Sequence, residues 1–137
     1  MEDCLFCKIV AGEIPSHKIY EDKNSFVFLD IHPQSLGHAM VIPKIHAVDI
    51  TELPQDKVGP LFETVQKMAK YIPETLGAAG LTVGINQGTV SGQVVPHLHV
   101  HLMPRFEGDG GGSVHSAVNN PPTEDVAKTA DRLKKNI

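Results

Sequence analysis

The stretch PHLHVHLMP, residues 96–104, places three histidines at every second position with aliphatic residues between them. Successive side chains of a β-strand point to opposite faces, so His97, His99 and His101 would share one face of a strand. The intervening aliphatic side chains would pack on the other face. A helix would scatter the imidazoles around its circumference, and the flanking prolines suit strand ends better than a helix interior. We therefore predict a strand over residues 94–103, with one face available for chemistry.

The rest of the chain predicts hairpins around one long helix. Runs of β-forming residues bounded by turn signals indicate further strands, and apolar residues at i, i+3 and i+4 indicate an amphipathic helix. Pro60 is expected in the first turn of that helix and Gly77 at its end. The elements expected are a short helix over 5–11, strands over 18–21, 25–31, 38–43 and 81–86, the long helix from 56 to about 76, and a helix from about 123. The fold class is therefore α+β, with a mainly antiparallel sheet of about five strands, one long helix and short terminal helices.

Length and composition predict one domain over residues 1–137, in which residues 109–137 form a flexible segment and a carboxy-terminal helix. Hydrophobic residues make up 41% of the chain and charged residues 20%, with no run long enough to cross a bilayer, so we expect no membrane role. A net charge of -4 argues against binding a nucleic acid polymer, but not against a single nucleotide. The start MEDCLFCKIV lacks the features of a signal peptide, which predicts a cytoplasmic protein.

The only two cysteines, Cys4 and Cys7, have C-x-x-C spacing. This spacing lets two thiolates reach one zinc ion, and two imidazoles would complete a tetrahedral site. His46 and His97 are the candidates, because each lies at the end of a predicted strand. Such a zinc would be structural. Two small buried thiols are the competing interpretation, and a redox pair is less favoured because the surrounding pattern is not a βαβ unit.

The three histidines have several interpretations. They could be surface residues of an edge strand, or zinc ligands of a metal hydrolase. Residues 97–103 also resemble the His-φ-His-φ-His-φ-φ motif (φ apolar) of the histidine triad family of nucleotide hydrolases and transferases. Residues 28–46 resemble the hairpin that precedes this motif in the family, 86–93 resemble its phosphate loop, and CLFCKIVAGEIPS resembles its amino-terminal segment, so the likeness covers residues 3–106.

Chemistry and resemblance both point to His99 as the nucleophile. A neutral imidazole attacks phosphorus near neutral pH without a metal, and the central histidine is best placed to be oriented by its neighbours. The resemblance implies that His99 attacks the α-phosphorus, forms a nucleotidyl-histidine and is released by water. It also implies that His101 and His38 lie beside the phosphate. Substrates would be nucleoside phosphoramidates, aminoacyl adenylates or dinucleoside polyphosphates, so the partner is a purine nucleotide or its conjugate.

The resemblance also implies which residues bind the nucleotide. Asp30 would accept both ribose hydroxyls, although an aspartate that starts a turn is the simpler interpretation. The amides of Asn86 and Gln93 would bridge sugar, phosphate or leaving-group oxygens, and Gly92 would let backbone amides approach the anion. Residues matching the wall of the base site, which could equally be core, are Leu5, Phe6, Ile9, Phe28 and Ile31.

Two positions depart from the family pattern. Val94 stands where many relatives carry serine or threonine, which removes a hydroxyl near the α-phosphate, and Leu29 stands where some carry histidine. The resemblance further implies a homodimer. Two other function classes stay open: a metal-dependent hydrolase with the three histidines as zinc ligands, and a nucleotide-binding regulatory module with little turnover.

Overall fold

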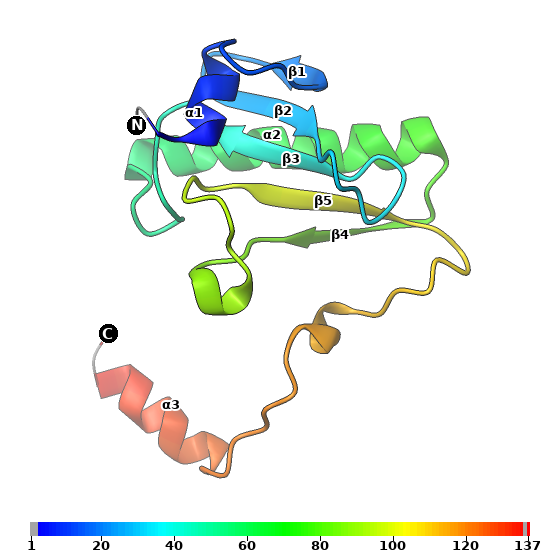
Figure 1. Cartoon of the computed structure of the whole chain (residues 1–137). Coiled ribbons are helices and arrows are strands. Elements are labelled where there is room, and N and C mark those ends of the chain that lie inside the picture. The colour runs from blue at the N-terminus through cyan, green and yellow to red at the C-terminus, as the bar shows by residue number, and fades with distance from the viewer. Residues whose placement is uncertain (1–2, 136) are drawn as a thin grey trace.

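Five antiparallel strands form one sheet in the spatial order β1-β2-β3-β5-β4 (Figure 1). The computed structural model describes residues 3–135 and residue 137. The strands are β1 (Lys18–Glu21), β2 (Ser25–Leu29), β3 (Ala39–Pro43), β4 (Gly80–Gly84) and β5 (Val100–Arg105). The predicted α+β class and five-stranded antiparallel sheet are confirmed. Because β5 pairs with β3 and β4, the histidine stretch enters the middle of the sheet rather than an edge.

A helix covers each face of the sheet. The long helix α2 (Gln55–Leu76) lies along one face, and the short helix α1 (Leu5–Val10) lies on the other (Figure 1). The core on the α2 side includes Val27, Val41 and Val100, which have no solvent-accessible surface. Burial of each such side chain stabilises the fold by about 1.5–3 kcal/mol. A second apolar cluster, which includes Phe6, Ile9 and Phe28, fixes α1 against the opposite face.

The predicted strand over residues 94–103 is wrong at its amino-terminal half. β5 begins at Val100, and residues 95–97 form a bend. The amide of His97 bonds to the carbonyl of Val95 at 2.8 Å, and that of Leu98 bonds to Ala47 at 2.7 Å, so these groups lie outside the strand ladder. The alternation of faces nevertheless extends through the bend. Leu98, Val100 and Leu102 pack on the α2 side, while His97 and His99 contact the Phe6 ring of α1.

Helix α2 contains two prolines inside its length, Pro60 and Pro73. It begins at Gln55, so Pro60 is the sixth residue and not part of the first turn as expected. Pro60 removes one intrahelical hydrogen bond, whereas the buried residues of α2, such as Leu61 and Met68, keep the apolar side packed. The predicted end is confirmed, because Gly77 adopts the left-handed conformation at φ 69° and caps the helix.

After β5 the chain leaves the sheet. Residues 106–113 pass beside β4 and β5, followed by the 3-10 turn η2 (Val114–Ala117) and α3 (Val126–Lys135), which lies apart from the sheet (Figure 1). Helix α3 starts later than the expected residue 123 and has no buried residue. The assignment of residues 1–137 to one domain stays a prediction. Among the described residues, no helix combines the length and hydropathy needed to span a bilayer.

At Gly37, the loop that follows β2 packs closely against the core. Its φ is +83°, and a Cβ built on it would collide with the Leu76 side chain of α2, with Pro104 and Ile72 also in contact. Gly12 has a similar φ of +79° but open space around it. We expect Gly37→Ala to lower the free energy of unfolding more than Gly12→Ala, by up to about 1 kcal/mol, because the added methyl group must displace the end of the Leu76 side chain in addition to straining the backbone. Urea denaturation measures both, and equal losses would contradict the packing argument.

Candidate active site

A pocket of about 510 Å³ opens on the α1 side of the sheet. It collects most of the residues that the sequence singled out for nucleotide binding. The predicted residues that line it are Leu5, Phe6, Ile9, Phe28, Asp30, Ile31, Asn86, Gly92, His99 and His101. Leu29 and Val94, the two departures from the family pattern, line it as well. We call this cavity the nucleotide pocket, after the binding role that the sequence analysis predicts for its residues. Its walls are mainly apolar, and among the described residues Asp30 is the only carboxylate that lines it.

His99 is held in a single orientation at the end of this pocket. Its Nδ1 lies 2.7 Å from the carbonyl oxygen of His97. A carbonyl only accepts hydrogen bonds, so Nδ1 carries the proton and Nε2 keeps a free lone pair. The Phe6 ring packs edge-on against the imidazole, with 5.2 Å between ring centroids. A neutral imidazole with one nitrogen fixed and the other unprotonated has the form needed for nucleophilic attack.

His38 and His101 form a relay of hydrogen bonds beside His99. The backbone N–H of Gln34 donates to His38 Nδ1 at 3.1 Å, so the proton of His38 lies on Nε2. That Nε2–H donates to His101 Nδ1 at 2.9 Å, which leaves the proton of His101 on its own Nε2. The rings of His99 and His101 lie 4.9 Å apart. The relay therefore makes His101 a hydrogen-bond donor next to His99, with His38 as its support.

Burial keeps this pair uncharged. It lowers the pKa of His101 to about 4, with smaller contributions from His99 and His38. Burial also lowers the pKa of His38, partly opposed by Asp30, whose Oδ2 lies 3.6 Å from His38 Nε2. Both imidazoles are therefore neutral at pH 7 and act as dipolar donors and acceptors rather than as fixed cations.

The loop between β4 and β5 is fixed by Gln93, a role that the sequence analysis missed. Gln93 does not line the nucleotide pocket. Its Oε1 accepts from the Gly88 amide at 2.9 Å, and its Nε2 donates to the carbonyls of Val48 at 2.7 Å and Val95 at 3.1 Å. The side chain is nearly buried and its amide holds the loop in place, and its contact with a nucleotide stays a prediction. Gly92, at φ +102°, does line the pocket and needs the conformational freedom of glycine.

The two cysteines meet two histidines behind the pocket. Cys4 Sγ lies 3.3 Å from His97 Nδ1, and Cys7 Sγ lies 3.4 Å from His46 Nδ1. The four ligand atoms all lie within 4.8 Å of one another. His97 Nε2 donates to the carbonyl of Pro43 at 2.9 Å, so its Nδ1 turns a lone pair toward the thiols. Burial raises the pKa of Cys7 to about 11 and lowers that of His97 to about 4. Two sulfurs and two imidazole nitrogens form a donor set that fits structural zinc.

The three histidines of the motif have three different sets of hydrogen-bond partners. His97 faces the cysteines, His99 bonds to a main-chain carbonyl, and His101 bonds to His38. A second cluster of possible metal ligands comprises Asp30, His38 and His101. The described residues therefore do not direct all three imidazoles of the motif to one point, as the zinc-hydrolase interpretation requires.

Comparison with known proteins agrees with this geometry. The model of the HIT domain matches residues 11–108. This chain belongs to the HIT family. It is 40% identical over 125 residues to the uncharacterized HIT-like protein MJ0866 of Methanocaldococcus jannaschii, covering 91% of this chain and 96% of that protein. The crystal structure of a HIT family member from Bacillus subtilis superposes with a TM-score of 0.86 at 36% identity, covering 98% and 97% of the two chains.

Other members of the HIT family carry functional names. A protein of Candida albicans named adenosine 5'-monophosphoramidase HNT1 is 33% identical over 98% of this chain and 91% of its own length. Adenylylsulfatase HINT3 of Arabidopsis thaliana is 38% identical over 78% of this chain and 54% of its own length. A zinc-bound histidine triad protein from Mycobacterium smegmatis superposes with a TM-score of 0.75 at 33% identity, covering 99% of both chains.

The lowered pKa of His101 predicts an acid-sensitive contribution to stability. His101 takes up a proton near pH 6.5 in the unfolded chain but only near pH 4 in the folded chain. The neutral His101 therefore makes its full contribution to the free energy of unfolding above pH 6.5, and this contribution is lost as the pH falls from 6.5 to 4. In this window the free energy of unfolding changes by at most about 1.4 kcal/mol per pH unit. His101→Gln should flatten the pH dependence of the free energy of unfolding in this window, as followed by urea titration. The same change at the exposed His17 is the control, and identical slopes in wild type and His101→Gln would contradict the assignment.

Proposed function

We propose that this protein hydrolyses nucleotide conjugates at the α-phosphate through a nucleotidyl-histidine on His99. One observation carries the proposal: His97 fixes the Nδ1–H of His99 at 2.7 Å, so that the unprotonated Nε2 is left for attack in the nucleotide pocket. Two relatives are named as an adenosine monophosphoramidase and an adenylylsulfatase. These names support cleavage of the bond between the α-phosphorus and the leaving group.

The reaction would proceed in two displacements. In the first, the P–Nε2 bond to His99 forms while the bond from phosphorus to the leaving group breaks, and the leaving group takes a proton from solvent water. In the second, water attacks phosphorus and gives a proton back to the solvent, the P–Nε2 bond breaks, and the nucleoside monophosphate leaves. The Nε2–H of His101 would donate to a phosphate oxygen throughout, and His38 would hold His101 in the required tautomer. No metal takes part in either step.

The pocket residues suggest how the nucleotide binds. Asp30 stands at the end of β2, where its carboxylate would accept the ribose hydroxyls. The buried rings of Phe6 and Phe28 and the exposed Ile31 would enclose a purine base. Asn86 and the backbone at Gly92 would contact the phosphate. The leaving group would be an amine, an acyl group, sulfate or a second nucleotide.

A metal-dependent hydrolase is the second candidate, because Asp30, His38 and His101 offer three ligand atoms within 4.8 Å of one another. The hydrogen bonds of His38 argue against it, since both of its ring nitrogens already have partners. A regulatory module that binds nucleotides with little turnover is the third. Turnover with and without EDTA separates the metal-dependent candidate from the favoured one.

We expect His99→Ala to lower kcat for adenosine 5'-phosphoramidate by about 10³-fold or more, because the P–Nε2 bond can no longer form. AMP release by the purified protein measures this, with His17→Ala as a control at an exposed histidine. Wild-type turnover should also survive EDTA. Unchanged kcat in His99→Ala would contradict the proposal, and loss of turnover in EDTA with the fold intact would favour the metal hydrolase.

We further propose that Cys4, Cys7, His46 and His97 hold a structural zinc, as their donor set and the zinc-bound relative suggest. Zinc would tie α1 to the sheet and stabilise the fold without supplying the nucleophile. The purified protein should contain about one zinc per chain by elemental analysis, given one four-ligand site. Cys4→Ser should release it, and chelation should lower the melting temperature more than turnover. A zinc-free native protein with an unchanged melting temperature in EDTA would contradict this proposal.

Homodimer formation and a cytoplasmic location are further proposals. Among the described strands, β1 and β4 each pair on one side only, so the sheet has two free edges that a second copy could cover.

A further inference from the structure

One wall of the nucleotide pocket comes from residues 3–16, the amino-terminal segment, which also carries both cysteines. The residues of the segment that line the pocket are Leu5, Phe6, Ile9, Ile14, Pro15 and Ser16. Leu5 and Phe6 stand between Cys4 and Cys7 in the sequence. The Phe6 ring packs against the rings of Phe28 and His99, with 5.4 and 5.2 Å between centroids. Any movement of the two cysteines would therefore move part of the pocket wall.

Few polar contacts hold the amino-terminal segment against the sheet. The described backbone hydrogen bonds of residues 3–16 stay within the segment, and these residues contribute no strand. Among the described residues, the hydrogen bonds that leave the segment all come from its two thiols. Cys4 Sγ lies 3.3 Å from His97 Nδ1, and Cys7 Sγ lies 3.4 Å from His46 Nδ1 and 3.5 Å from that same His97 atom. Because a helix of six residues is unstable by itself, the position of α1 depends on these contacts and on its apolar packing.

A metal ion would strengthen this attachment. A thiol is a weak hydrogen-bond donor and a weak acceptor, whereas a thiolate binds zinc directly. Zinc held by Cys4, Cys7, His46 and His97, which we call the four-ligand cluster, would join two ligands of the segment to two ligands outside it. None of the four is among the described residues that line the nucleotide pocket. The metal would therefore act on the pocket through its wall and not by touching the nucleotide.

We propose that metal binding at the four-ligand cluster and nucleotide binding in the pocket strengthen each other. The inference rests on the proposed nucleotide-binding role and on the proposed zinc site, and it links the two. Two states of the amino-terminal segment carry the coupling: the wall is in place, as observed, or it is released from the sheet. The four ligands lie together, and Phe6 contacts His99, only in the first state. Either ligand that selects this state therefore raises the population that the other binds.

Calorimetric titration of the full chain with AMP tests the coupling, at a temperature where circular dichroism shows both metal forms folded. The zinc-loaded chain should bind AMP about tenfold more tightly than the chain freed of metal by dialysis against EDTA, a typical size for coupling between two sites. By reciprocity, saturating AMP should raise the affinity for zinc by the same factor, as measured by competition with a chromophoric chelator. The main-chain hydrogen bond of His99 does not involve the metal, so kcat at saturating substrate should still survive EDTA.

A ligand outside the amino-terminal segment gives the sharpest variant. His46 neither belongs to the segment nor is among the described residues that line the pocket, so its effect on AMP must pass through the metal. His46→Asn should release zinc and weaken AMP binding about tenfold, as metal removal does. His17→Asn, at an exposed histidine that is not a ligand, is the matched control and should change neither affinity. Cys7→Ser repeats the test if His46→Asn does not fold.

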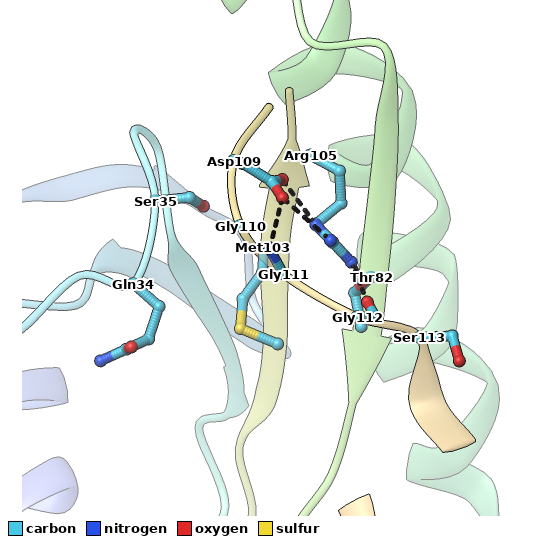
Figure 2. Close-up of a pocket in the computed structure, with 10 residues that line it drawn as sticks. All are labelled: Gln34, Ser35, Thr82, Met103, Arg105, Asp109, Gly110, Gly111, Gly112 and Ser113. Atoms are coloured by element: carbon cyan, nitrogen blue, oxygen red, sulfur yellow. Dashed lines mark hydrogen bonds and ion pairs between the residues drawn. The ribbon is translucent and has the colours of Figure 1, made fainter. Parts of the chain in front are cut away.

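A destabilising change elsewhere separates the coupling from a general loss of stability. Arg105 lines a second cavity of about 400 Å³, where its Nε and Nη2 bond to the two carboxylate oxygens of Asp109 at 2.8 and 3.1 Å (Figure 2). No described residue that lines this cavity belongs to the amino-terminal segment. Arg105→Gln removes the ion pair and should lower the melting temperature, while the Kd for AMP stays within about twofold of wild type because the sites are independent.

The outcomes separate this inference from the two proposals beneath it. If the chain binds zinc and AMP but the AMP affinity is the same with and without zinc, both proposals stand and the coupling is refuted. The coupling is also refuted if Arg105→Gln weakens AMP binding as much as metal removal does. A chain that binds no zinc refutes the coupling together with the zinc site, and a zinc-loaded chain that binds no AMP refutes it together with the proposed function.

Discussion

His97 is the residue on which the rest of the site depends, because it makes three different interactions at once. Its Nε2–H donates to Pro43 on the neighbouring strand β3, its Nδ1 faces the thiols of Cys4 and Cys7, and its carbonyl accepts the Nδ1–H of His99. The first two contacts are made by a side chain with no exposed surface, so losing either partner would leave a buried polar atom unsatisfied. The third fixes the tautomer of the proposed nucleophile. One buried histidine thus joins the amino-terminal helix, the sheet and the site of chemistry.

Burial determines the protonation states of the histidine pair in the candidate active site. It keeps His38 and His101 neutral at pH 7, so these two side chains act through the directions of their hydrogen bonds rather than through charge. In the proposed mechanism, His38 and His101 would therefore contact the phosphate as neutral donors and acceptors while the unprotonated Nε2 of His99 attacks phosphorus.

Sequence patterns predicted the faces of the histidine stretch better than its secondary structure. Alternation of Leu98, Val100 and Leu102 with the histidines follows from which side chains must be buried, and that requirement holds through the bend at residues 95–97. The bend itself depends on a long-range hydrogen bond to Ala47, which no local pattern contains. Gln93 stays a predicted ligand contact, whereas its hydrogen bonds to the carbonyls of Val48 and Val95 come from tertiary packing that the sequence pattern does not contain. The tautomers of the histidines likewise depend on partners up to 63 residues away.

The central claim is that His99 Nε2 forms a covalent bond to phosphorus. Rapid mixing of the full chain with adenosine 5'-phosphoramidate, quenching within the first turnover at a pH that preserves P–N bonds, and peptide mass spectrometry would locate any adduct directly. The account predicts a mass increase of one AMP moiety on the peptide that contains His99, with fragmentation assigning it to that side chain, and with EDTA having no effect. Steady AMP release with no adduct at any quench time, or an adduct on a different residue, would contradict it.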